Sequence, residues 1–535
     1  ASYVIIQKAA ARVIIPLMHR YLYFAVFVSG MSSLAMEMAA SRLLSNNFSS
    51  SNLVWASVIG LILIYLAVGY YLGGRWADRS PHFTTMFKIM AWAGFLCGVV
   101  PVVARPVMRF TEQAFNQLQM GVLFGSFVTV LVVFIAPTVL MGMTSPFAIR
   151  LAVKDRESAG VTAGNIYALS TLGSFIGTFL PVLVLSSLVG TFRSFIVIGG
   201  TLLLVALVGL WKAAGARAVL PLAWMPVILL ALGIVGIRGF DRATPGLIYE
   251  TESGYNYIQV VEENGYHLLR LNEGQGVHSI YHPDVLNYQG PWEQVLAAPF
   301  FNPAPYPPAA VERMAIIGLA AGTTARQAAI VYPQITIDGY EIDPKIVTAG
   351  REYFGMTMPN LNVYVVDGRV GLKQSDNLYQ VISVDAYRPP YIPPSMVTQE
   401  FFTIVREHLT DDGVMVINVG RGPDDRRLVD ALASTILTVF PSVHVMDLPG
   451  TYNSLVFATA QPTQAANLME NYAALSVAGS GAHPLLLETL SVTLTNLQPA
   501  PEPGVVFTDD KAPIEWMTNN LILSYLFSPA GETTQ

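Results

Sequence analysis

Long apolar runs separated by short polar loops occupy the first half of this 535-residue chain. Seven runs stay apolar for about 19 residues or more, the length that a helix needs to cross roughly 30 Å of hydrocarbon. We expect these spans near residues 21–44, 53–74, 84–104, 122–145, 165–188, 193–211 and 218–237. The pattern predicts a multi-pass α-helical membrane domain of about seven spans, which we assign to residues 1–242.

From about residue 243 the pattern changes to the shorter runs of a soluble domain. Two candidate strands, near 257–262 and 267–271, predict a small β-rich subdomain over residues 243–300. Further strands are expected near 314–318, 335–340, 362–366, 380–385, 413–419 and 454–459, with helices near 323–332, 344–354, 395–408 and 424–440. This alternation predicts an α/β doubly wound domain of the Rossmann, methyltransferase-like type over residues 301–535.

Composition supports this division of the chain. Charged residues make up 12% of it, against roughly 25% in soluble domains. Residues 1–242 hold 17 Lys and Arg against 6 Asp and Glu, whereas residues 243–535 hold 13 against 30. The acidic half lacks the basic face that phosphate binding needs, which excludes nucleic acid as a partner. The single cysteine, Cys97, excludes an intrachain disulfide and a cysteine-based zinc site.

Lys and Arg are unevenly shared between the two sets of loops. With the N-terminus inside, the segments on its side carry ten of these residues and the segments on the other side carry five. This bias predicts an integral protein of the cell membrane with a cytoplasmic N-terminus. Seven spans then place the acidic C-terminal domain outside the cytoplasm, and one span more or fewer reverses that placement.

The apolar half contains one acid deep within a span, Glu37, five residues before Arg42. An ionisable residue in a membrane is by default a functional-site hypothesis, because leaving it in lipid is expensive. The alternative is a structural charge pair or an anchor at the end of the helix. Small residues recur in two spans and indicate closely packed helices, at Gly69, Gly73, Gly74, Gly173 and Gly177.

Small and acidic residues follow successive strands of the predicted α/β domain. The first strand runs into a turn from Gly318 to Gly322, where small residues let a ligand approach the next helix closely. Glu341, Asp367 and Asp385 follow the next three strands. Because parallel strands end at one edge of a sheet, these carboxylates should line a single ligand-binding crevice. The alternative is that each carboxylate only caps a helix.

These motifs resemble the spermidine synthase (polyamine aminopropyltransferase) family, and the whole chain resembles its membrane-fused bacterial members. In the acidic half, the resemblance runs from Glu252-Ser253-Gly254-Tyr255-Asn256-Tyr257 to Thr508-Asp509-Asp510-Lys511-Ala512-Pro513. In the apolar half it covers residues 30–44, 69–79 and 167–173. The resemblance implies a bound adenosyl-sulfonium donor, either S-adenosylmethionine or its decarboxylated form.

The resemblance also implies roles for individual residues. It places Glu341 on the donor's ribose and Asp367 with Gly368 on the adenine side. It makes Asp385 the base that receives a proton from the acceptor. The other expected donor-binding residues are Gly318 and Gly322 of the turn, Asn256 in place of the family's glutamine, and Gln275.

The chain departs from the family pattern on the side of the acceptor. Ala321 replaces an acid that lies near where the carboxylate of S-adenosylmethionine would sit, so a like-charge penalty against the intact donor is removed. Arg388 replaces the second acid of the catalytic strand and would repel a polyammonium substrate, so ordinary spermidine synthesis is not expected. Tyr387 and Arg388 open the run 387–394, which is rich in proline and aromatic residues. That run is either a lid over the acceptor or a stiff loop docked on a neighbour.

Three hypotheses of function remain from the sequence. The first is a membrane-tethered transferase that acts on an amine or hydroxyl acceptor with Asp385 as base. The second is a catalytically silent scaffold, with other subunits of a membrane complex or further copies of itself as partners beside the lipid bilayer. The third, an amine transporter, rests on Glu37. No metal is expected, because His278 and His282 lack a third ligand at a defined spacing.

Overall fold

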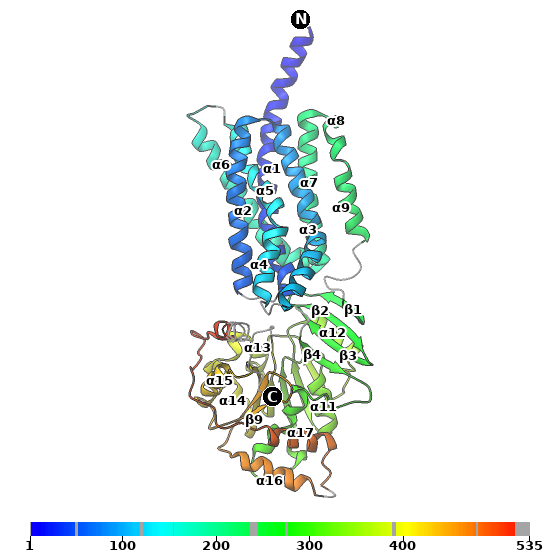
Figure 1. The fold of residues 1–535 in the computed structure, drawn as a ribbon, viewed down its shortest axis with the longest axis vertical. Coiled ribbons are helices and arrows are strands. Elements are labelled where there is room, and N and C mark those ends of the chain that lie inside the picture. The colour runs from blue at the N-terminus through cyan, green and yellow to red at the C-terminus, as the bar shows by residue number, and fades with distance from the viewer. Residues whose placement is uncertain are drawn as a thin grey trace. The chain divides into compact units, whose positions relative to one another are not determined.

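The computed structural model describes residues 2–48, 52–117, 121–153, 155–235, 244–272, 276–387, 392–477, 480–518 and 520. The chain divides into two compact units (Figure 1). The first comprises Ala1–Ala243 with Glu252–Gly254, and the second comprises Thr244–Thr251 with Tyr255–Gln535.

The first unit is helical. Its helices are α1 (Ser2–Phe48), α2 (Asn52–Arg79), α3 (Phe83–Gln117), α4 (Gly121–Val133), α5 (Ile135–Ala152), α6 (Ala159–Leu180), α7 (Ser186–Ala214), α8 (Ala216–Val219) and α9 (Trp224–Val235), with a π-helical turn at Pro181–Leu185 and a 3₁₀ turn at Leu220–Leu222. In the described part of the chain, six segments are long and apolar enough to cross a membrane: Met18–Leu44, Trp55–Arg79, Phe83–Met108, Ile135–Ala152, Ala159–Leu185 and Leu188–Ala214. A bent pair, Ala216–Leu222 and Trp224–Ile234, meets at 47° and passes the same test only when taken together.

The fourth predicted span, 122–145, has the wrong bounds. A helix break at Phe134 divides it into α4 and the start of α5, and the apolar segment of spanning length is Ile135–Ala152. Pro137 explains the break, because it has no N–H to donate to the carbonyl of Val133 and so fits only the first turn of a new helix.

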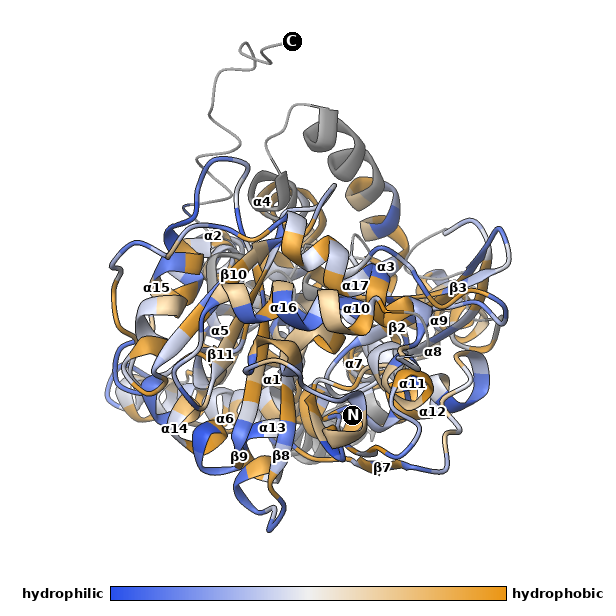
Figure 2. Cartoon of the chain, turned by 90° about the horizontal axis from the view of Figure 1, so that it is seen from below, coloured by the Kyte–Doolittle hydropathy of each residue, from blue (hydrophilic) through white to orange (hydrophobic). Residues whose placement is uncertain are grey.

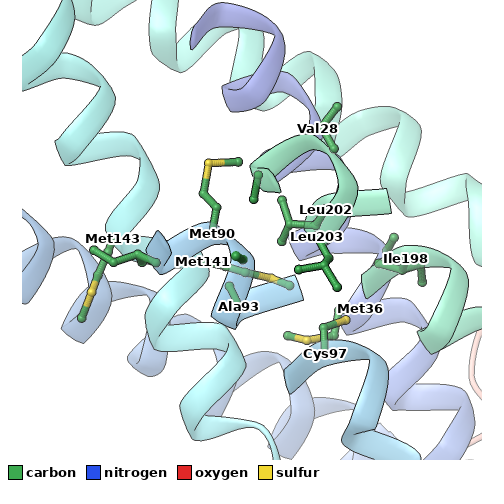
Figure 3. Close-up of a cluster of buried hydrophobic side chains, with 14 of the residues drawn as sticks. Val28, Met36, Met90, Ala93, Cys97, Met141, Met143, Ile198, Leu202 and Leu203 are labelled. Atoms are coloured by element: carbon green, nitrogen blue, oxygen red, sulfur yellow. The ribbon is translucent and has the colours of Figure 1, made fainter. Parts of the chain in front are cut away.

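Sulfur-containing side chains fill much of the buried core of the helical unit. Figure 3 shows Met36 of α1, Cys97 of α3 and Met141 of α5 gathered with Leu203 of α7. Cys97 is fully buried. Unbranched thioethers adapt to irregular gaps, which suits a junction where four helices meet.

Glycines set how closely the helices approach. A Cβ built on Gly73 of α2 would lie 2.6 Å from the Cα of Met143 in α5, and one on Gly69 would meet the same helix. Gly173 and Gly177 of α6 face the backbone of α1 in the same way. The predicted close packing is confirmed at these four glycines. Gly74 differs, because a Cβ there would meet nothing within 4 Å.

Glu37 and Arg42 behave differently from each other. Arg42 forms an ion pair, its Nε lying 2.6 Å from Oε1 of Glu252, and it also donates to the carbonyl of Ser253. Both partners group with the helical unit. Glu37 is 6% exposed and makes no hydrogen bond or ion pair to another described residue. The charge pair expected as one alternative therefore exists, but its acid is Glu252.

The second unit contains two sheets. A four-stranded sheet has the order β1 (Leu247–Glu252), β2 (Tyr257–Glu263), β3 (Tyr266–Leu271) and β4 (Val277–Tyr281). A seven-stranded sheet has the order β10-β11-β9-β8-β5-β6-β7, formed by β5 (Arg313–Ile317), β6 (Thr336–Tyr340), β7 (Leu361–Tyr364), β8 (Tyr379–Val384), β9 (Leu409–Gly420), β10 (Ser442–Asp447) and β11 (Asn453–Thr459). The strands β7, β6, β5, β8 and β9 are parallel, and β11 and β10 continue the sheet in the antiparallel sense.

Helices complete this α/β unit. They are α10 (Pro291–Gln294), α11 (Thr323–Val331), α12 (Pro344–Tyr353), α13 (Gly368–Lys373), α14 (Gln399–Glu407), α15 (Arg427–Leu437), α16 (Ala465–Leu475) and α17 (Pro484–Thr495), with 3₁₀ turns at Val295–Phe301, Pro308–Ala310 and Pro394–Met396. Separate apolar clusters pack α11 and α17, and α14 and α15, onto the large sheet. Figure 2 shows hydrophobic and hydrophilic residues mixed along α15 and α16, as expected for helices that cover a sheet. The predicted Rossmann-type domain is confirmed.

We predict that Gly73→Ala destabilises the protein and that Gly74→Ala does not. The new methyl at Gly73 would overlap the α5 backbone and lower the unfolding free energy by about 1–3 kcal/mol. The adjacent Gly74 has open space, so its methyl should be neutral or slightly stabilising through helix propensity. Thermal unfolding of the full-length protein in detergent measures both. Equal effects of the two changes would contradict this account of the packing.

Candidate functional site

Four predicted site residues lie at the carboxyl edge of the large sheet. Gly318 follows β5, Glu341 follows β6, Asp385 follows β8, and Asp367 lies just after β7. In the sheet order β8-β5-β6-β7, the glycine turn therefore stands between Asp385 and Glu341. Parallel strands place these chain ends together, which is where open α/β sheets bind ligands.

The turn after β5 (318–322) needs unusual backbone angles. Gly318 and Gly322 have φ of +85° and +86°, which glycine adopts without strain. A Cβ on Gly318 would lie 2.5 Å from the carbonyl oxygen of Asp385, so glycine also allows these two chain segments to touch. Ala320 has φ of +49°, a left-handed conformation that costs a residue with a Cβ about 1–2 kcal/mol.

The backbone amides of this turn already donate hydrogen bonds to atoms of the protein. The hydrogen bonds run from Gly318 N and Leu319 N to Tyr340 O, from Ala320 N to Glu341 Oε2, from Ala321 N to Ser279 Oγ, and from Gly322 N to Leu319 O. A phosphate cradle requires several free amides that point at the ligand. The turn therefore does not offer the phosphate cradle of a dinucleotide site, and it suits a nucleoside without phosphates.

Glu341 is buried and held in one orientation. It is 7% exposed, with Oε2 accepting from Ala320 N at 2.9 Å and Oε1 from Asp343 N at 3.0 Å. Burial raises the pKa of Glu341 to about 7, and these backbone hydrogen bonds act in the opposite direction. Each carboxylate oxygen has a further lone pair, so the side chain can still accept hydroxyl hydrogens from a ligand.

Asn256 joins the small sheet to α12. Its Nδ2 donates to Asp343 Oδ2 at 3.0 Å, and its Oδ1 accepts from Asn272 Nδ2 at 3.0 Å. Asp343 also caps α12 by accepting from Lys345 N. Both ends of the Asn256 amide thus serve protein contacts beside Glu341. Two other predicted residues lie outside the described residues: Gln275 on the donor side and Arg388 on the acceptor side.

Asp367 and Gly368 form the start of α13. The Asp367 carboxylate accepts from Val370 N at 3.1 Å, which is a helix cap of the kind weighed as the alternative to ligand binding. Gly368 is buried, and a Cβ there would collide with Ile317 of β5. Glu341 and Asp385 make no such cap, so the capping alternative accounts for only part of the carboxylate set.

Asp385 is held between two strands. Its N–H donates to the carbonyl of Ile317 in β5 at 2.9 Å, and its Oδ1 accepts from Asn418 Nδ2 in β9 at 3.0 Å. Burial raises the pKa of Asp385 to about 6, while the hydrogen bond from Asn418 lowers it. A carboxylate with a pKa near neutrality can receive a proton at physiological pH and release it again.

Two further residues shape this side of the site. Tyr387 donates its hydroxyl hydrogen to the carbonyl of Asn418 at 3.1 Å and accepts from Gly420 N at 2.9 Å, so its hydroxyl fixes the loop after β8 to the end of β9. Asn418 was missed by the sequence reasoning. Its only signal is a polar residue within the apolar run 414–419.

The described residues contain no group of three or more His, Cys, Asp and Glu side chains that could hold a metal ion. His282 accepts from Asp284 N through Nδ1. Burial lowers the pKa of His278 to about 4, so this ring stays neutral at physiological pH.

Comparison with known proteins gives a consistent result. A family model described as "Spermine/spermidine synthase domain" matches residues 309–467. A probable polyamine aminopropyl transferase of Bifidobacterium longum is 33% identical over 327 residues, covering 58% of this chain and 71% of that protein. A polyamine aminopropyltransferase of Vibrio vulnificus is 28% identical over 256 residues, covering 45% of this chain and 81% of that protein. Among solved structures, a probable spermidine synthase from Corynebacterium glutamicum matches with 19% identity and a TM-score of 0.37, covering 47% of this chain and 95% of that one.

We predict that Glu341 makes the stability of the second unit depend on pH. Folding raises the pKa of this acid from 4.5 to about 7, so the folded state holds the proton more tightly than the unfolded state. The contribution of Glu341 to the free energy of unfolding is fully present below pH 4.5 and is lost as the pH rises through about 7. Across this window, the free energy of unfolding of the wild-type protein should therefore fall by roughly 3 kcal/mol relative to that of Glu341→Gln.

Pulse proteolysis of the full-length protein in denaturant, at pH values on both sides of this window, measures the difference. Glu407→Gln, a change at an exposed acid of α14, serves as control and should track the wild type throughout. A constant difference between wild type and Glu341→Gln at all pH values would show that Glu341 does not titrate as described.

Proposed function

The chain belongs to the spermine/spermidine synthase family, and from this premise we propose that it is a membrane-anchored transferase that uses an adenosyl-sulfonium donor. The observation that carries the proposal is the placement of Glu341 and Asp385 on either side of a turn whose amides leave no phosphate cradle. The acceptor is an amine or a hydroxyl compound.

The donor site suits a positively charged nucleoside. Glu341 would accept hydrogens from the ribose, and Asp367 with Gly368 would border the adenine. Ala321 is 1% exposed and packs in an apolar cluster with Ile258 and Ala349, so the turn has no acid at the position where the family carries one. The loss of that acid permits S-adenosylmethionine as well as its decarboxylated form, because no fixed charge at this position opposes the donor's own carboxylate.

Asp385 would act on the acceptor. When bound, the donor supplies a sulfonium leaving group. The acceptor nitrogen or oxygen forms a bond to the carbon next to sulfur, the carbon–sulfur bond breaks, and its electron pair stays on sulfur as a neutral thioether. Asp385 receives the proton that the acceptor loses. The protein's own contribution is positioning and one base.

The helical unit would anchor the enzyme in the lipid bilayer. We infer seven spans, with the bent pair Ala216–Leu222 and Trp224–Ile234 as the seventh. With a cytoplasmic N-terminus, this number places residues 243–535 outside the cytoplasm, with 243–300 as a small β-rich subdomain. Partners other than lipid are further copies of the chain or other membrane subunits.

A second candidate function is a catalytically silent scaffold within a membrane complex. The observation that favours it is the state of two residues expected to touch ligands. The amide of Asn256 and the hydroxyl of Tyr387 are both engaged in contacts within the protein. Calorimetric titration of the full-length protein with S-adenosylmethionine, its decarboxylated form and methylthioadenosine separates the candidates. Micromolar binding supports the transferase, and no binding by folded protein supports the scaffold.

We predict that Asp385→Asn abolishes turnover but leaves donor binding within about tenfold, because the base acts on the acceptor and general-base catalysis contributes 10²–10⁴-fold. Release of methylthioadenosine from the decarboxylated donor, or of S-adenosylhomocysteine from the intact one, measures turnover with putrescine and other amines. Asp411→Asn, at the exposed opposite end of β9, is the matched control and should keep full activity. Full activity of Asp385→Asn would remove Asp385 from the mechanism.

Sidedness can be tested with an introduced thiol. Cys97 is fully buried and is the single cysteine of the chain, so Met469→Cys on α16, where Met469 is 59% exposed, adds one accessible thiol. We expect a membrane-impermeant maleimide to label it in intact cells. Labelling only after lysis would show that the C-terminal half is cytoplasmic, which with a cytoplasmic N-terminus means an even number of spans.

A further inference from the structure

Asn418 is a buried polar residue in an apolar strand. It is 8% exposed, stands near the carboxyl end of β9 and is flanked by Ile417 and Val419. An amide is buried at considerable cost unless it forms hydrogen bonds. The Asn418 side chain donates one, to Oδ1 of Asp385 on the neighbouring strand unit at 3.0 Å. This bond joins the proposed base to an uncharged side chain of the neighbouring strand.

This hydrogen bond fixes the direction of the amide. Only the NH₂ end can donate to a carboxylate, so the amide oxygen of Asn418 is the end that does not bind Asp385. That oxygen is buried and has no hydrogen-bond partner among the described residues. The backbone of Asn418 is fixed as well, because its carbonyl accepts from the Tyr387 hydroxyl, which is in turn bound by Gly420 N. If the Asn418 side chain turned away, its NH₂ group and Oδ1 of Asp385 would both lose this hydrogen bond.

We propose that Asn418 is the positioning residue of Asp385: it holds the carboxylate in one orientation and favours its ionised form. The inference rests on the transferase function proposed above. The bond engages Oδ1 of Asp385, which leaves Oδ2 to receive the acceptor's proton.

The electrostatic surroundings of Asp385 agree with this role. Burial raises the pKa of Asp385 to about 6, and the bond from Asn418 acts against that rise. Burial also holds the pKa of Tyr387 far above its usual range, so this neighbour stays uncharged. Ionisable groups at this edge of the sheet, among the described residues, include Glu341, Asp343 and Asp367, together with Arg421, which pairs with Asp447. Removing the Asn418 amide leaves burial unopposed and moves the pKa of Asp385 upward.

The test reads the protonation of Asp385 directly and needs no turnover. Carbodiimides modify protonated carboxyl groups, and mass spectrometry of the full-length protein in detergent, without donor, gives the labelling of Asp385 as a function of pH. Asn418→Ala should raise the labelling midpoint by about one pH unit. Asn362→Ala is the matched control, because Asn362 Nδ2 donates to the buried Asp338 at 2.9 Å, a bond of the same kind elsewhere in the sheet. It should leave the Asp385 midpoint unchanged.

A midpoint that moves in Asn418→Ala and stays fixed in Asn362→Ala supports the inference. An unchanged midpoint in Asn418→Ala, or equal shifts in both variants, overturns it. With an amine acceptor that supports turnover of the wild type, the acid limb of kcat should move to higher pH in the Asn418 variant while KM for the donor stays within about twofold. A labelling shift with no turnover from any donor would reject the transferase but keep the positioning role. Turnover with no labelling shift would keep the transferase but reject the positioning role of Asn418.

Discussion

The turn between β5 and α11 is the constraint on which the rest of the site depends. A buried backbone amide must find a hydrogen-bond partner, and the amides of residues 318–321 find theirs on β6, on Glu341 and on Ser279 of the small sheet. One short segment therefore fixes the orientation of the Glu341 carboxylate and the attachment of the small sheet. It also touches the backbone of Asp385, so Glu341 and Asp385 share a single support.

The helical unit is held together by a different kind of contact. Within a membrane, burial of apolar side chains gives helices little reason to associate, and close van der Waals packing has to supply it. Glycines on α2 and α6 bring backbones together, and adaptable methionine side chains fill the junction of α1, α3 and α5. The ion pair between Arg42 and Glu252 joins a residue far along the chain to this unit.

The sequence predicted the parallel core of the second unit well, because buried parallel strands are continuous apolar runs that end in recognisable turns. It did not predict β10, an edge strand whose polar and apolar residues are mixed, nor the break at Phe134, where one proline interrupts an unbroken apolar run. The carboxylates of the site were visible because each follows its own strand. The link between Asn418 and Asp385 was not, because it depends on β9 lying next to β8 in the sheet, and sequence order alone does not determine that neighbour.

The predicted site residues also divide into those with capacity left to bind a ligand and those whose polar groups are used within the protein. Glu341 can still accept hydrogen bonds after its backbone contacts. The Asn256 amide uses both its NH₂ group and its oxygen within the protein, and the Tyr387 hydroxyl both donates and accepts there. Residues that match a family motif can thus serve the geometry of a site without contacting what it binds.

The left-handed Ala320 has a consequence for how the turn meets a ligand. Glycine would adopt this conformation without strain, whereas the alanine methyl disfavours it. The turn keeps it because the amides of residues 318–321 are hydrogen-bonded to Tyr340, Glu341 and Ser279. The strain of the turn is thus offset when the protein folds. Little conformational entropy of the turn then remains to be lost when a ligand binds. The turn is preorganised, which favours affinity through rigidity without adding any contact.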